Sequence, residues 1–124
     1  MNAQAALNSF WNSFGWDAYE ENTVPENIFS TRSEYITYSA GWSEFGNPTM
    51  LTASLWQRAT SWTGAVEKAD QIADEIGLGG KIIPTDNGCV WIKRGTPFSQ
   101  RMSDEDPTIR RIYLNVEVEF LTAI

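Results

Sequence analysis

The last part of the chain alternates between apolar and polar side chains. From Ile112 to Phe120 every even position is large and apolar, and the odd positions between them are Tyr113, Asn115, Glu117 and Glu119. A period of two is typical of a strand that buries one face and leaves the other face polar. The pattern predicts a long final strand over residues 109–121.

Two other stretches repeat with the period of a helix. The first is predicted to form a helix over residues 3–14, with an apolar face built from Leu7, Phe10, Trp11 and Phe14. The second helix is predicted over residues 63–76, with an apolar face built from Val66, Ala69, Ile72, Ala73 and Ile76. Gly15 and Gly77 follow these patterns as terminators, and Ser61 or Thr63 is expected to cap the second helix.

Shorter patterns predict the remaining strands. "EYITYSA" (34–40) and "TMLTASLWQRA" (49–59) are expected to pair antiparallel, and the Gly-rich loop 41–48 between them is expected to expose Trp42 and Phe45. "GGKIIP" (79–84) and "CVWIKR" (89–94) flank the turn signal "DNG". Residues 17–33 follow no regular pattern and are interpreted as a connector. Helices and strands in this order predict a single α+β domain over residues 1–124, with a mostly antiparallel sheet, two helices on one face and a long C-terminal β-hairpin.

The hairpin is predicted to pair 89–102 with 109–121 around the acidic tip "SDEDPT", broken at Gly95–Pro97, where a bulge or an edge position is expected. Its final strand would be roughly 40 Å long, whereas a domain of this size is only roughly 35 Å across. Two alternatives follow. Residues 89–121 form a projecting arm that docks on another subunit, or the hairpin twists and folds over its own sheet.

Charge and composition narrow the classes of function. The net charge is −7, and no basic residue precedes Arg32, so the chain is a poor general binder of nucleic-acid phosphates. Arg110 and Arg111 form the one adjacent Arg pair, and we expect them to be solvated and to face the acids of the tip. A single cysteine excludes an internal disulfide, and no stretch is apolar enough for a membrane span. A cytoplasmic location during assembly is expected.

The candidate catalytic chemistry is sparse. The chain has no histidine and one cysteine, which excludes Ser–His and Cys–His nucleophiles and thiolate zinc sites. "GLGG" (77–80) has the wrong spacing for a phosphate loop. The carboxylates at 74–75 and 104–106 are expected to be solvated, so a carboxylate enzyme or a weak Ca²⁺ site at the tip is disfavoured. We expect no enzymatic activity, no metal and no cofactor.

Six tryptophans raise one further alternative, a module that stacks a sugar or other small ligand on indole rings. Trp11, Trp56 and Trp91 are expected to lie in or near the core. Trp42 is then the exposed candidate, and an exposed Trp more often marks a protein interface than a glycan site.

The segment "KRGTPFSQRMSDEDPTIRRIYLNVEVEFLTA" (93–123) resembles the C-terminal half of the small tail-terminator and head–tail joining proteins of long-tailed bacteriophages. In that family a strand with a basic residue leads through a Pro–Phe segment and an acidic loop into a final alternating strand. The opening amphipathic helix, the Tyr-rich strand "EYITYS" and the helix "VEKADQIADEIG" occur in the same order.

The resemblance implies a structural virion protein of the tail or neck that forms a ring, typically a hexamer. The ring caps the tail tube and joins it to the head connector, and DNA passes through its channel without specific binding. Glu117 and Glu119 are expected to face that channel. We expect interface residues in the loop 41–48 and in the hairpin, at Trp42, Phe45, Phe98, Arg101, Asp104, Glu105, Asp106, Arg110 and Arg111. Another neck or tail-tube component of the same virion is the alternative.

Overall fold

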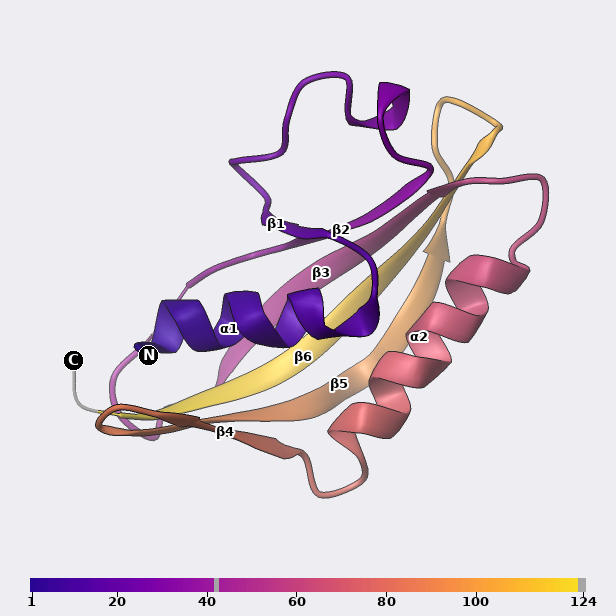
Figure 1. The fold of residues 1–124 in the computed structure, drawn as a ribbon. Coiled ribbons are helices and arrows are strands. Elements are labelled where there is room, and N and C mark those ends of the chain that lie inside the picture. Colours follow the sequence, from indigo (N-terminus) through magenta and orange to yellow (C-terminus); the bar gives the residue numbers. More distant parts are fainter. Residues whose placement is uncertain (42, 123–124) are drawn as a thin grey trace.

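The computed structural model describes residues 1–41 and 43–122, which form one six-stranded sheet with two helices on one face (Figure 1). The strand order is β1-β2-β3-β6-β5-β4. The strands are β1 (Ala18–Glu20), β2 (Glu34–Tyr38), β3 (Thr49–Arg58), β4 (Lys81–Thr85), β5 (Gly88–Met102) and β6 (Ile109–Thr122), and the helices are α1 (Ala3–Trp11) and α2 (Thr63–Ile76). The α+β class predicted from the sequence is confirmed. In the described residues no helix is long and apolar enough to cross a membrane.

The C-terminal hairpin lies within its own sheet. The strand β6 pairs antiparallel with β3 from Arg58↔Ile109 to Thr49↔Val118, and it pairs with β5 on its other side. A projecting arm at 89–121 is therefore the wrong alternative of the two. The physical reason is that β3 extends over ten residues, so it satisfies nearly the whole backbone edge of β6 that an arm would have left free.

The expected interruption of β5 is present. The pairing of β5 with β6 shifts register between Arg94 and Ser99, and the Thr96–Pro97 peptide bond is cis. Gly95 lies close to the backbone of Asn115, where an added Cβ would approach the Asn115 carbonyl oxygen to 2.8 Å. Gly95 and Pro97, separated by Thr96, thus place the bulge where the strand could not continue its ladder.

The sequence patterns do not predict the edge of the sheet that β1 forms. Residues 17–33 were interpreted as a connector, but β1 pairs parallel with β2 in the register Ala18↔Ile36 to Glu20↔Tyr38. The strand has only three residues, too few to show a period. Its pairing is also with a strand well separated along the chain, which no local pattern reports.

The first helix begins at an Asn cap and buries one face. The side chain of Asn2 accepts a hydrogen bond from the amide of Ala5 at 2.8 Å. The predicted stretch 3–14 divides into α1 and a 3₁₀ turn, Asn12–Phe14, that ends at Gly15 with φ 87°. The predicted apolar face is confirmed, because Leu7, Phe10, Trp11 and Phe14 are all buried.

The second helix has the predicted bounds but a different N-cap residue. Its N-cap position is Trp62, which makes no side-chain capping bond, so the expectation for Ser61 or Thr63 is wrong. Gly77 ends the helix as expected, and its amide donates to the carbonyl of Ala73. Lys68 donates to the carbonyl of Phe14 at 2.6 Å, which ties the helix to the end of the 3₁₀ turn.

The core lies between the two helices and one face of the sheet. Its sheet side consists of alternate residues of β3, β5 and β6, and Leu55, Leu114, Val90 and Val118 are fully buried there. The even positions of 112–120 pack toward the helices, as the alternation predicts. Burial of side chains of this size stabilises the fold by roughly 1.5–3 kcal/mol each.

Candidate functional site: the open face of the sheet

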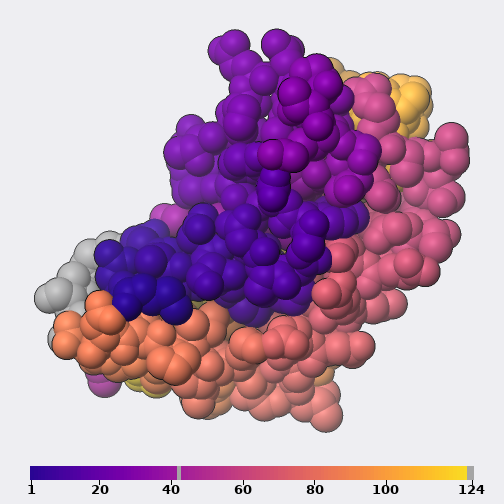
Figure 2. Space-filling view, in the orientation of Figure 1, coloured from indigo at the N-terminus to yellow at the C-terminus, as the bar shows by residue number. Residues whose placement is uncertain are grey.

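The face of the sheet opposite the helices carries the odd residues of β6, and we call it the open face. The view in Figure 2 is from the other side, where α1 and α2 cover the sheet. Register places several cross-strand neighbours of the odd β6 residues on the open face, among them Trp91 beside Glu119, Lys93 and Met50 beside Glu117, and Trp56 beside Arg111. Three large exposed apolar side chains, Met50, Ile82 and Met102, also belong to this face.

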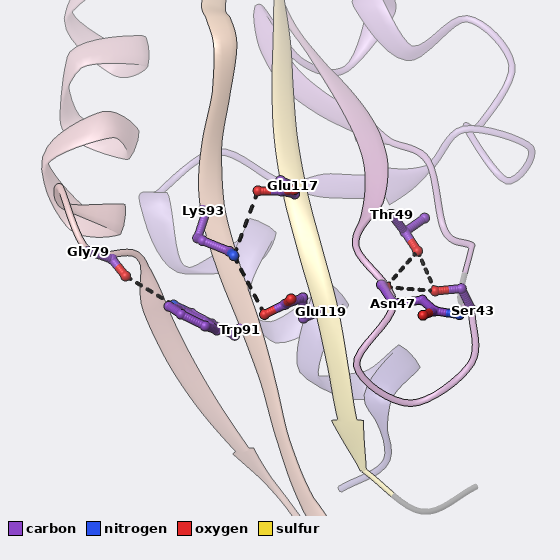
Figure 3. A network of polar contacts seen from close by, with 8 residues as sticks. All are labelled: Ser43, Asn47, Thr49, Gly79, Trp91, Lys93, Glu117 and Glu119. Atoms are coloured by element: carbon purple, nitrogen blue, oxygen red, sulfur yellow. Dashed lines mark hydrogen bonds and ion pairs between the residues drawn. The ribbon is translucent and has the colours of Figure 1, made fainter.

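Glu117 and Glu119 share one lysine. The ammonium of Lys93 lies 3.7 Å from the carboxylate of Glu117 and 3.5 Å from that of Glu119 (Figure 3). The same ammonium lies 4.1 Å from the ring centroid of Trp91, whose indole N–H donates to the carbonyl of Gly79 at 3.0 Å. The two expected channel residues therefore lie side by side on the open face, and one of their two charges is neutralised by a neighbouring strand.

A row of aromatic and basic side chains crosses the other end of the open face. Tyr35, Trp56 and Arg111 occupy directly opposite positions on β2, β3 and β6. The rings of Tyr35 and Trp56 are stacked with centroids 6.0 Å apart, and the guanidinium carbon of Arg111 lies 4.5 Å from the Trp56 centroid. A groove of about 440 Å³ runs over this row, and Glu21 and Val24 contribute to its wall.

Tyr35 is the buried member of this row. Burial raises the pKa of its phenol above the ordinary value, the charge of Asp104 adds to the rise, and Arg111 opposes it. The hydroxyl therefore stays protonated throughout the neutral range. It can act in the groove as a neutral donor but not as a base.

The outer edge of β5 is free over most of its length. The strand β4 pairs only with Gly88–Ile92, from Thr85↔Gly88 to Lys81↔Ile92. No strand in the described part of the chain pairs with the outer side of residues 93–102, although β6 pairs with them on the inner side before and after the bulge. An unpaired strand edge is a ready template for another chain.

The acidic tip is organised by its own backbone. Asp106 accepts hydrogen bonds from the hydroxyl and amide of Thr108, at 2.7 and 2.9 Å, and these bonds lower the pKa of its carboxyl. Asp104 accepts from the amide of Asp106 at 2.9 Å, and Glu105 is exposed. The basic partner of Asp106 is Arg58, at 3.6 Å.

In the described residues neither Arg110 nor Arg111 forms an ion pair with an acid of the tip, and the two arginines do not act as a pair. Strand alternation sends the two side chains to opposite faces: Arg110 to the helix side, Arg111 to the groove. Arg110 donates to the carbonyl of Thr60 at 3.0 Å, and both Arg101 and Arg110 lie over the ring of Trp62, at 5.1 and 5.5 Å. The eight expected interface residues that the structure describes are therefore spread over both faces, the tip and the loop that contains Phe45.

The aromatic candidate residues also differ in their exposure. Phe45 is 68% exposed in its loop, whereas Phe98 is half-buried and packs against the core. Trp42 lies outside the described residues. Trp11 is buried as expected, but Trp56 and Trp91 lie half-exposed on the open face, away from the core, so the expectation that they lie in or near the core is wrong. Their alternation with buried neighbours in β3 and β5 could have shown this.

The open face offers hydrogen-bond donors, exposed apolar side chains and a free strand edge. Within residues 1–41 and 43–122 no group of three or more Cys, Asp or Glu side chains could hold a metal ion. The arrangement can contact another molecule through charge, stacking and backbone pairing. No family model, curated protein or solved structure matches this chain.

Proposed function

We propose that the chain is a structural subunit of a phage tail or neck that assembles into a ring, caps the tail tube and joins it to the head connector. The observation that carries the proposal is the free outer edge of β5 at residues 93–102. This edge lies within the segment that resembles tail-terminator and joining proteins. A subunit that repeats around an axis can cover such an edge with the next copy, through a heterologous interface that closes on itself.

The composition of the open face supports the same proposal. Met102 is 38% exposed and lies in the free segment of β5 itself. Large apolar side chains on a sheet face lose contact with water when a partner covers them, and that burial favours association. The role requires positioning and pairing but no active site.

Glu117 and Glu119 provide the charge that the proposal places on the channel wall. A net negative wall repels DNA phosphates and discourages sticking during transit. Because Lys93 neutralises one of the two charges, the local balance of the three side chains is −1. Replacing both Glu117 and Glu119 by Lys is expected to reduce infectious particles. Unchanged assembly and DNA ejection would remove these two residues from the channel.

Electron microscopy of particles made without this chain tests the role. Overlong polymerised tails are expected if the subunit terminates the tube. Normal tails lying free beside full heads would instead favour joining, or another neck component of the same virion. Complete, infectious particles made without the chain would overturn the proposal.

A further inference from the structure

The groove on the open face contains a guanidinium with unused donors. The Nε–H of Arg111 donates to the hydroxyl of Ser54 at 3.2 Å. The guanidinium also lies over Trp56 and, at 5.7 Å, over Tyr113. None of the ion pairs in the described part of the chain includes Arg111. Its two Nη groups are therefore held in a fixed plane with no carboxylate partner.

The walls of the groove supply further donors around that plane. Thr37 accepts the indole N–H of Trp56 at 2.9 Å, so its own hydroxyl hydrogen remains available. The side chains of Tyr113 and Thr52 line the same groove, beside the stacked rings of Tyr35 and Trp56. An aromatic floor with one planar cation and several hydroxyls matches a flat, singly charged acid.

We propose that this groove binds a carboxylate, with the acid group on the Nη donors of Arg111 and its apolar body against Trp56. The fixed guanidinium plane lets both carboxylate oxygens be bound at once, as ordinary arginine–carboxylate pairs are. At about 440 Å³ the groove is large enough for an acid with an aromatic ring or a short aliphatic chain. This proposal does not depend on the ring-forming role.

The surroundings favour a single negative charge over a phosphate chain. Glu21 lies in the wall of the groove, and the whole protein carries a net charge of −7. Both oppose a polyanion, because each further negative charge on the ligand adds repulsion without adding a second cation. A monocarboxylate meets one arginine and is neutralised by it.

Titration with benzoate, followed by ¹⁵N NMR of the Trp56 indole N–H and the Arg111 Nε–H, tests the proposal. Benzamide is the matched neutral probe, since it has the same shape without the charge. Benzoate is expected to shift both signals saturably, and benzamide to bind at least roughly tenfold more weakly. Equal binding of the two probes, or no shift with benzoate, would overturn the proposal.

Single substitutions distinguish benzoate binding in the groove from benzoate binding elsewhere on the protein. Arg111→Met is expected to abolish benzoate binding. Arg101→Met is the control, because it removes a guanidinium that lies over Trp62 on the helix side, and it should leave benzoate binding unchanged. Glu21→Gln keeps the groove intact and is expected to tighten binding several-fold, because a repulsive charge is removed. Wild-type binding by Arg111→Met would contradict the assignment, and so would weaker binding by Glu21→Gln.

Two sources can bring a carboxylate to this groove: a free small acid or an acidic side chain of a second copy. Sedimentation over a range of protein concentrations, with and without benzoate, distinguishes them. Self-association that benzoate or Arg111→Met reverses assigns the groove to a second copy. A monomer that binds benzoate at every concentration assigns it to a free acid. If neither the monomer nor the self-associated protein binds benzoate, the proposed site is refuted.

Discussion

The two faces of the sheet are built from the same strands but differ in burial and in the contacts that their side chains make. In β6 the even residues toward the helices are almost completely buried, and Leu114 and Val118 have no exposed area. The odd residues of the same strand are half-exposed and make ion pairs, stacks and hydrogen bonds. One alternating strand thus separates the residues that hold the fold from those that can meet a partner.

We expect the open face to contribute less to the stability of the fold than the helix face does. Burial of apolar side chains dominates folding, and the helix face holds nearly all of the fully buried ones. The open face is held by half-exposed ion pairs, which contribute roughly 0–1 kcal/mol each. Substitutions there are expected to alter binding and assembly while the protein remains folded.

The largest expected effect comes from truncating the helix face. Leu114→Ala should lower the free energy of unfolding by about 3 kcal/mol, because it leaves a cavity in a packed core. Glu117→Gln, three residues further along the same strand, should change it by less than about 0.5 kcal/mol. Urea unfolding measures both. Similar losses of unfolding free energy for the two variants would show that the two faces contribute equally to stability.

A smaller effect is expected from the lysine of the open face. Lys93→Met leaves Glu117 and Glu119 beside each other without a cation, which should cost about 0.5–1 kcal/mol at low salt. The cost should shrink in 1 M salt, because screening weakens the repulsion. Lys81→Met, which separates an exposed pair with Glu75, is the control. A loss for Lys93→Met that salt does not change would indicate packing instead of charge.

The smallest expected effect is a change in pH dependence at Tyr35. The folded state raises the pKa of this phenol, mainly through burial. The corresponding stability is therefore complete below the pKa of the unfolded state and is lost as pH rises through the folded pKa. Tyr35→Phe should flatten the fall of stability above pH ~10, near the ordinary Tyr value, in urea unfolding over a pH series. An unchanged slope would mean that Tyr35 ionises as readily as in the unfolded chain.

The periodic elements could be predicted from the sequence, since the alternation of 112–120 and the helical faces report burial directly. The bulge was also predictable, because Gly95 and Pro97 cannot both continue a regular ladder. The short parallel β1 and the central position of β6 depend on pairing between distant segments, which no local pattern contains. The groove was missed for the same reason: Tyr35, Trp56 and Arg111 are adjacent only across three strands.

The central claim is that the free edge of β5 joins one copy to the next. Successive residues of a strand direct their amides to opposite edges of that strand. One of the two variants Ser99→Pro and Gln100→Pro therefore removes an N–H that points away from β6, and we call it the outward variant. The other variant removes an N–H that faces β6. Negative-stain microscopy of the purified protein, alone at high concentration and mixed with tail tubes, measures the outcome. We predict rings for the wild type, and a folded monomer without rings for the outward variant. A wild type that stays monomeric in both conditions, or an outward variant that still forms rings, would contradict the account.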